Sequence, residues 1–284
     1  MADQTYALTL SCQDQPGIVA AVTSELFKLG CNIAESSQYW DRSTNKFFMR
    51  IAFAAKASTS TREIQSALAR VNDRFDIETN LTDTNRKPRI IIMVSKFDHA
   101  MLHVLYQIRV GWLNAEVVAI ISNHEDSRRT ADHEGIPYYL LPVTKENKAE
   151  QEKKLAAVVT ETDAELIILA RYMQVLSNDL SEKMRGRIIN IHHSFLPSFK
   201  GAKPYHQAYD RGVKLIGATA HYVTADLDEG PIIDQETERV SHSMTAEDFV
   251  ATGRDIEARV LSRAVKMHLE SRVLVNGHKT VVFG

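Results

Sequence analysis

Three polar residues in the second half of this chain carry side chains that could act together on a carbonyl group. Asn190 and His192 lie two positions apart in the run RIINIHH, and Asp228 lies in the run TADLDEGP. An amide and an imidazole can donate hydrogen bonds to a developing oxyanion, and a carboxylate can take a proton from an attacking molecule. We therefore expect Asn190, His192 and Asp228 to be catalytic. His221, in the run GATAHYV, is expected to support them by orienting Asp228 or a water molecule.

The strand pattern around Asn190 explains how these side chains could meet. Side chains alternate between the two faces of a strand, so Asn190 and His192 point to the same face. In an open parallel sheet, ligands bind beyond the carboxyl ends of the strands, and the run RIINIH ends at His192. For an isolated Asn or His, a capping amide or a core histidine is the commoner explanation. The co-occurrence with His221 and Asp228 favours a functional site.

The second part of the chain has the pattern of an α/β domain with a Rossmann-like, mostly parallel sheet. Near-continuous apolar runs alternate with helical or mixed segments, which is typical of strands buried on both faces. A later pair of strands is followed by a long helix, predicted from about Thr245 to Leu269, and Asn276-Gly277 predicts a hairpin turn. The apolar runs are RIIIMVS, EVVAIIS, YYLLP, LIILA and RIINIH.

The first part of the chain has a different, βαββαβ pattern, which predicts a ferredoxin-like domain. Its first helix is expected between Pro16 and Gly30, and its second from about Thr61 to Val71. Both helices have apolar residues at helical spacing, so each needs the sheet to cover one face. A polar, proline-containing stretch then separates the two patterns. We predict a first domain, a linker and a second domain at residues 1–83, 84–89 and 90–284.

Composition limits the classes of function. The 284 residues include 34 Lys plus Arg and 36 Asp plus Glu, so the net charge of −2 favours neither nucleic acid nor an anionic membrane as a partner. The first residues lack a basic leader, and no apolar run approaches the roughly 20 residues that span a bilayer, so a cytoplasmic location is expected. Cys12 and Cys31 lie in periodic segments and suit free thiols.

The turn before the first helix, DQPGIV at residues 14–19, resembles the signature of the ACT family of small-ligand regulatory domains. This resemblance implies a homo-oligomer with an effector site for an amino acid, with glycine and methionine as the candidates. Backbone N–H groups at a helix N-terminus suit a carboxylate. The expected effector contacts are Asp14, Gly17 and Ile18. The alternative is that the Pro-Gly pair only makes the turn.

The runs NIHHSFLP and LDEGP resemble the folate-dependent formyltransferase family, whose usual pattern is Asn-Ile-His-Pro-Ser-Leu-Leu-Pro followed by His-x-Val and Leu-Asp-x-Gly-Pro. This resemblance implies the same catalytic set, with Asn190, His192 and Asp228 acting on the formyl group and His221 supporting them. The stretch LARYMQVLS resembles the segment that lines the family's pterin pocket. It implies folate contacts from Met173, Gln174, Val175 and Leu176, for which packing in the core is the alternative.

Two departures from the family pattern change the expected reaction. Members that formylate a phosphorylated amine carry a Gly-rich loop after their first strand, whereas this chain has SKFDHAML at residues 95–102. His193 stands where the family has proline. Together with the ACT-like first domain, these features resemble the branch in which water replaces the amine. The implied reaction is hydrolysis of 10-formyltetrahydrofolate to formate and tetrahydrofolate, with no cofactor and no metal.

Other hypotheses stay open at the level of sequence. A formyltransferase acting on an unphosphorylated amine would keep the same polar residues, and a folate or amino-acid sensor would use both domains for binding alone. A metal-dependent amide hydrolase is suggested by four histidines that lack the spacing of a His-Glu-x-x-His helix, namely His192, His193, His206 and His221. Lys200 and Lys203 could meet the glutamate tail of folate, with a solvated loop as the alternative.

Overall fold

A computed structural model describes residues 4–196 and 204–284, which divide into two compact units. The chain passes from the first unit to the second between Lys87 and Pro88, inside the predicted linker. It returns to the first unit near its end, which the sequence did not predict. Residues up to 87, 270–276 and 281–284 form the first unit, and residues 88–269 and 277–280 form the second.

The described residues of the first unit confirm the predicted βαββαβ order. The sheet has the strand order β2-β3-β1-β4, and each neighbouring pair is antiparallel. Both helices place their apolar residues in one core with the sheet. The elements are β1 (Gln4–Gln13), α1 (Ile18–Lys28), β2 (Asn32–Asp41), β3 (Lys46–Ala55), α2 (Thr61–Phe75) and β4 (Glu78–Asp83).

Local signals fix the ends of the two helices of this unit. Gly17 precedes α1 with φ 96°, a left-handed conformation that glycine adopts without strain. Ser60 and Glu63 form a reciprocal capping box at the start of α2. Helix α2 extends to Phe75 rather than Val71, because Phe75 is buried and continues the apolar stripe of the helix.

In the described part of the second unit, seven strands form a mostly parallel sheet, as predicted. The order is β11-β10-β9-β8-β5-β6-β7, and β10 runs antiparallel to both of its neighbours. The elements of this unit are β5 (Arg89–Val94), α3 (His99–Arg109), β6 (Glu116–Ser122), α4 (Arg128–Glu134), β7 (Tyr138–Leu140), α5 (Lys148–Glu161), β8 (Leu166–Leu169), α6 (Asn178–Lys183), β9 (Ile188–His192), α7 (Pro204–Asp210), β10 (Leu215–Tyr222), β11 (Ile232–Arg239) and α8 (Ala246–Leu269). The hairpin strands β12 (Val273–Asn276) and β13 (Lys279–Val282) follow, and β12 and the end of β13 belong to the first unit.

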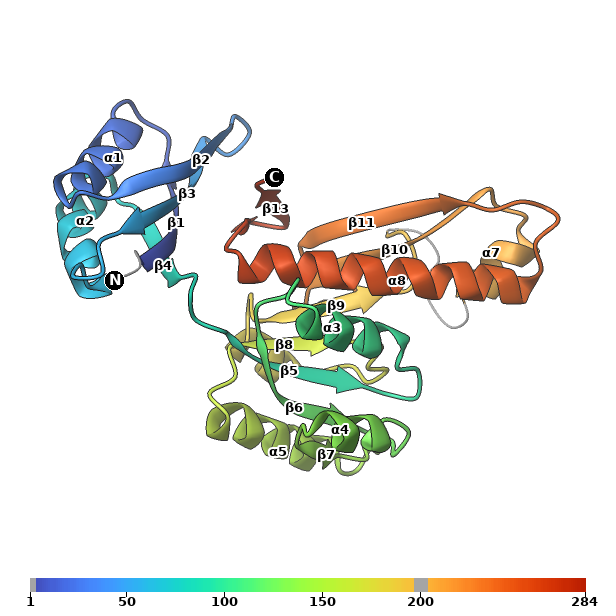
Figure 1. Cartoon of the computed structure of the whole chain (residues 1–284). Coiled ribbons are helices and arrows are strands. Elements are labelled where there is room, and N and C mark those ends of the chain that lie inside the picture. The colour runs from blue at the N-terminus through green and yellow to red at the C-terminus, as the bar shows by residue number, and fades with distance from the viewer. Residues whose placement is uncertain (1–3, 197–203) are drawn as a thin grey trace. The chain divides into compact units, whose positions relative to one another are not determined.

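Helices cover this sheet and leave one edge open for a site. Apolar residues of α5 and α6 pack on one face of β5, β6 and β8. Helix α8 runs along β10 and β11 and packs against α3 (Figure 1). The chain leaves β5 for β6 on one side and later places β8 on the other, so the order of strands reverses there. Ligands bind at such a switch point, beyond the carboxyl ends of the strands.

Candidate active site

Strand pairing brings Asn190 and His221 together. The two residues lie opposite each other in the antiparallel pair of β9 and β10, and Asn190 Nδ2 is 3.2 Å from His221 Nε2. His221 Nδ1 lies 2.9 Å from the carbonyl oxygen of Tyr222. A carbonyl oxygen only accepts, so Nδ1 carries the proton and Nε2 accepts from the Asn190 amide. Burial lowers the pKa of His221, with the Tyr222 carbonyl opposing this effect, which agrees with a neutral ring.

His192 and Asp228 form the second contact of the site. His192 Nδ1 is 3.2 Å from Asp228 Oδ1, and the same oxygen is 3.8 Å from His221 Nε2. The hydrogen bond from His192 holds the pKa of Asp228 below its usual range, although burial opposes it. Asp228 is therefore a carboxylate that accepts the Nδ1 proton. His192 Nε2 is buried and has no hydrogen-bond partner among the described residues, so it is available to a substrate or water.

The loop between β10 and β11 places Asp228 in this position. Asp228 itself adopts φ 58°, an uncommon conformation for a residue other than glycine, and such strain is often found at functional sites. A Cβ atom at Gly230 would lie 1.7 Å from the carbonyl oxygen of Tyr222. The Tyr222 N–H donates to the Pro231 carbonyl at 2.9 Å. The glycine and proline of the LDEGP run therefore shape the turn that presents the carboxylate.

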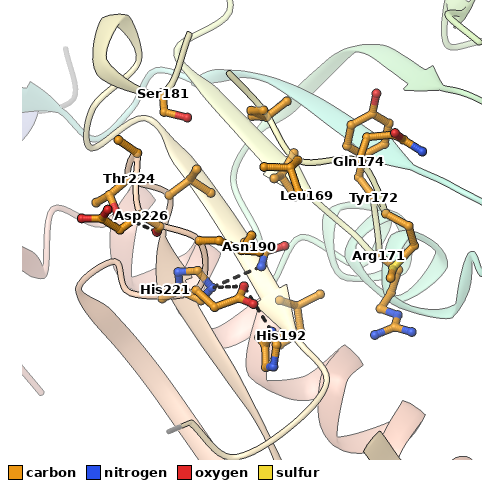
Figure 2. A pocket seen from close by; sticks show the side chains of 18 of the residues that line it. Leu169, Arg171, Tyr172, Gln174, Ser181, Asn190, His192, His221, Thr224 and Asp226 are labelled. Carbon is orange, nitrogen blue, oxygen red and sulfur yellow. Dashed lines mark hydrogen bonds and ion pairs between the residues drawn. The ribbon is translucent and has the colours of Figure 1, made fainter. Parts of the chain in front are cut away.

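One cavity joins these polar residues to the predicted folate segment. Figure 2 shows Asn190, His192 and His221 turned toward one another, with the segment through Tyr172 and Gln174 along another side. Met173 and Val175 are exposed, whereas Leu176 is buried in the core. The predicted residues that line this cavity are Met173, Gln174, Val175, Leu176, Asn190, His192, His221 and Asp228.

Hydrogen bonds fix the backbone of the predicted folate segment. The Met173 N–H donates to Ser95 Oγ at 3.0 Å, and Ser95 Oγ donates to Asn123 Oδ1 at 2.7 Å. Ser95 directly follows β5, so the switch point of the sheet holds this segment in place.

The structure adds lining residues that the sequence did not single out. Arg171, Tyr172, Thr224 and Asp226 line the cavity (Figure 2). Burial raises the pKa of Tyr172 to about 12, so its hydroxyl is neutral at physiological pH. Arg171 lies inside the quoted stretch LARYMQVLS, two residues after the end of β8. A cation at the carboxyl end of a parallel strand is the signal that could have identified it.

The predicted effector residues lie at the start of α1 in the first unit. The Asp14 N–H donates to the Asn45 carbonyl at 2.9 Å, which extends the pairing of β1 with β3 by one residue. Gly17 is exposed, but the Ile18 side chain is 2% exposed and packs in the core. At Ile18, therefore, the side chain serves the fold, and an effector would have to use the backbone.

Three other features considered in the sequence are a pair of lysines, a metal site and a membrane span. Lys200 and Lys203 lie outside the described residues. Across the ranges 4–196 and 204–284, no group of three or more His, Cys, Asp or Glu is arranged to hold a metal ion. In the same ranges, no helix combines the length and apolar character needed to cross a bilayer.

Comparison with protein families agrees with this architecture. Residues 88–265 match the family described as formyl transferase, and residues 5–82 match the ACT domain. A formyl transferase domain preceded by an ACT domain defines the class. The chain belongs to the formyl transferase family.

Relatives with the same two-domain arrangement define the group within that family. A protein of Corynebacterium sp. (strain P-1) named formyltetrahydrofolate deformylase is 45% identical over 99% of both chains. One of Bacillus subtilis with the same name is 49% identical over 97% of this chain and 93% of its own. The crystal structure of formyltetrahydrofolate deformylase from Burkholderia mallei superposes with a TM-score of 0.95 at 46% identity, covering 99% of this chain and 100% of that one.

Phosphorylated-acceptor enzymes of the family are more distant. Glycinamide ribonucleotide transformylase 1 from Symbiobacterium toebii superposes with a TM-score of 0.65 at 28% identity. The match covers 70% of this chain and 95% of that one. The likeness to this enzyme is thus limited to about two thirds of the chain, in contrast to the full-length relatives.

Proposed function

We propose that this protein hydrolyses 10-formyltetrahydrofolate to formate and tetrahydrofolate. The observation that carries the proposal is the convergence of Asn190, His192 and Asp228 on one cavity, next to the segment at residues 173–176. The relatives that match over the whole length carry the name of this activity. The fold alone would fit many reactions, so the site bears the argument.

The proposed mechanism follows from what hydrolysis of a formamide requires. The formyl nitrogen of the substrate is an aryl amine whose lone pair is partly drawn into the ring, so its carbonyl is more open to attack than that of a peptide. Water adds to the formyl carbon and gives up a proton, and the carbonyl oxygen becomes an oxyanion. The nitrogen then gains a proton and the C–N bond breaks.

Each requirement has a candidate residue. The Asn190 amide donates to the oxyanion, as His192 does when its Nε2 is protonated. Asp228 acts as base toward water, directly or through His192, and returns the proton to the leaving nitrogen. In the route through His192, Asp228 holds Nδ1–H, so Nε2 has a lone pair that can take the proton.

A single assay tests the proposed function. Pure protein is incubated with 10-formyltetrahydrofolate in the absence of any amine, and formate and tetrahydrofolate are measured. We expect both products in equal amounts, and activity that persists after exhaustive chelation of metal ions. Formation of tetrahydrofolate only when an unphosphorylated amine is added would instead identify a formyltransferase. Binding of the folate without any product would identify a sensor.

The cellular role follows from the proposed reaction. Hydrolysis regenerates tetrahydrofolate and supplies formate, which can feed purine synthesis and balance one-carbon pools. Since unregulated hydrolysis would waste the activated formyl group, an ACT domain that binds glycine or methionine fits this reaction. We further propose a cytoplasmic homo-oligomer that needs no cofactor, with the folate as substrate.

A further inference from the structure

A buried cluster of charged and polar side chains lies beside the proposed active site. Glu257 of α8 is 1% exposed and is the centre of the cluster. Its Oε2 lies 2.8 Å from His99 Nε2 and 3.3 Å from Arg171 Nε, and its Oε1 accepts from the Tyr205 hydroxyl at 2.8 Å. Three separate segments therefore hold one carboxylate of α8.

Glu257 is ionised in this cluster. Burial alone would raise the pKa of Glu257, but the hydrogen bond from His99 and the charge of Arg171 outweigh burial and lower it. A buried carboxylate needs such partners, because an unpaired one would be costly. The hydrogen bonds from His99 and Tyr205 satisfy one lone pair on each oxygen, so Glu257 does not depend on Arg171 for hydrogen bonding.

The guanidinium of Arg171 has donors to spare. The Arg171 side chain is 12% exposed, and its Nε and Nη1 atoms are buried without a hydrogen-bond partner among the described residues. The 3.3 Å approach of Nε to Glu257 is thus an ion pair that lacks hydrogen-bond geometry. A buried donor without a partner typically costs about 1–3 kcal/mol. An acceptor that reached these two atoms would remove this cost.

Arg171 faces the cavity that contains the proposed catalytic residues. Among the described residues that line this cavity, it is the only Lys or Arg, and Asn190 and His192 line the same space. In Figure 2, the Arg171 side chain points away from Tyr172 and Gln174. The Arg171 side chain is therefore not directed along residues 173–176, which follow it in the chain.

The backbone at Arg171 is held in an uncommon conformation. Its φ is 66°, in the left-handed region, and its carbonyl accepts from the Ser95 N–H at 3.3 Å. A residue other than glycine in this region costs of order 1–3 kcal/mol and persists where its surroundings over-determine it. Strain at a cationic side chain that lines a cavity points to a ligand rather than to packing.

We propose that Arg171 binds the formate anion produced in the cavity. This inference rests on the proposed function. The formyl group of the substrate is neutral, and a negative charge that persists appears only when the C–N bond breaks. At that point one proton of the attacking water has gone to the leaving nitrogen, formic acid has given the other to solvent water, and formate remains with a charge of −1. A planar guanidinium with free N–H groups matches a carboxylate in shape and charge.

Charge on the other side of the cavity favours the same assignment. Asp226 and Asp228 line the cavity as well, and the pKa of Asp228 is lowered, mainly by His192. A newly formed carboxylate beside Asp228 is repelled by it and attracted by Arg171. Arg171 therefore stabilises the product, and it separates formate from the Asp228 carboxylate before release.

The proposal is tested by measuring how tightly variants bind formate under conditions in which no catalysis takes place. Protein loaded with tetrahydrofolate is titrated with ¹³C-formate and, as a neutral analogue of similar shape, with formamide, and binding is followed by NMR. The key variant is Arg171→Met combined with Glu257→Gln, which removes both charges and leaves no unpaired ion in the interior. Its matched control is Glu257→Gln alone, which keeps Arg171.

Only the double variant should lose affinity for formate. We expect the double variant to bind formate about 10-fold more weakly or worse, because a charge-assisted pair of hydrogen bonds is lost. Glu257→Gln should bind formate as tightly as the unchanged protein or more tightly, since Arg171 loses its counter-charge. Formamide affinity should stay within about 2-fold in both, because a neutral ligand gains little from the charge.

Equal weakening of formate and formamide in both variants would assign Arg171 a structural role and overturn the proposal. Unchanged formate affinity in the double variant would overturn it as well. Neither result depends on catalysis, because tetrahydrofolate and formate are supplied directly. A failure of the proposed function would instead appear as missing formate in the amine-free assay. The two failures are therefore distinguishable.

Discussion

At the scale of single residues, the position of the proton on His221 determines which groups of the site can donate hydrogen bonds. His221 donates from Nδ1 to a carbonyl oxygen and therefore receives the Asn190 amide at Nε2. This bond fixes which atom of the Asn190 side chain is nitrogen, an assignment that geometry alone often leaves open. The second amide hydrogen of Asn190 is then free to serve an oxyanion.

Asp228→Asn tests the base of the proposed mechanism. We expect formate release to fall by about 10²- to 10⁴-fold, because an amide can neither take a proton from water nor hold His192 in the required tautomer. Affinity for the folate, measured by fluorescence titration, should stay largely unchanged. Near-normal turnover in this variant would exclude Asp228 from the mechanism.

Asn190→Ala tests the oxyanion contact. We expect turnover to fall about 10²- to 10³-fold with little change in KM, because the oxyanion exists only on the way across the barrier. Steady-state kinetics separate the two parameters. A rise in KM with turnover intact would show that Asn190 binds the ground state instead.

The meeting of four polar residues in one cavity could be predicted, because three of them lie in regular strands and the fourth lies in the loop that follows. Asn190 and His192 share a face by the period of two, and His221 and Asp228 lie in one short run. Arg171 and Glu257 could not be paired in this way. They are far apart in the sequence, and each alone resembles an ordinary surface charge, which is the commonest place for these residue types.

At the scale of elements, the turn between β10 and β11 is the most constrained part of the site. Gly230 lies so close to the Tyr222 carbonyl that no Cβ atom fits. We expect Gly230→Ala to displace the turn and lower turnover at least about 10-fold, because misplacing a reacting group by about 1 Å can cost as much as 10²-fold. The activity is measured per folded protein at low temperature.

Gly217→Ala is the matched control for this prediction. A Cβ atom at Gly217, near the start of β10, would lie 2.4 Å from the Glu236 carbonyl oxygen. This variant should lose stability in the same way yet retain turnover per folded protein. Equal losses of turnover in both variants would show that general damage to β10, rather than the position of Asp228, explains the effect.

Helix α8 carries a partly buried histidine that makes stability depend on pH. His268 Nδ1 lies 2.7 Å from the Tyr222 hydroxyl oxygen, and burial lowers the pKa of His268 from 6.5 to about 4. Between these pH values, the unfolded chain binds a proton at His268 that the folded protein excludes. Its contribution is therefore complete above pH 6.5 and is lost as the pH falls toward 4, by up to about 3 kcal/mol.

His268→Gln removes this titration while keeping an acceptor for the Tyr222 hydroxyl. We expect a flatter decline of the free energy of unfolding between pH 6.5 and 4, measured by urea denaturation. Tyr222→Phe keeps the imidazole and should preserve the steeper decline even though overall stability falls. An identical pH dependence in His268→Gln and the unchanged protein would contradict the assignment.

The architecture of both units could be predicted because periodicity and turn residues agree with each other along the chain. The first unit has an antiparallel βαββαβ pattern and the second has the pattern of a parallel sheet. The passage of the chain from the first unit to the second could therefore be predicted. The return of the chain to the first unit was not, because it depends on specific hydrogen bonds. Arg50 donates to the Glu270 carbonyl, and Asn276 donates to Asp41 at 2.6 Å.

At the scale of the whole molecule, the ACT domain predicts an effector. We expect glycine or methionine to bind the intact protein and to change the rate of formate release, because the proposed hydrolysis consumes an activated group. Isothermal calorimetry with each amino acid measures the binding, and alanine serves as a comparison ligand. Absence of heat with both glycine and methionine would remove them as effectors of this protein.

The return of the chain also bears on how the protein is made. Residues 270–276 and 281–284 belong to the first compact unit, although the ribosome synthesises them after all of α8. The amino-terminal unit therefore stays incomplete while residues 88–269 are synthesised and fold. Arg50 and Asp41 therefore gain their contacts with Glu270 and Asn276 only after α8 has been made, so a product truncated after α8 lacks both contacts.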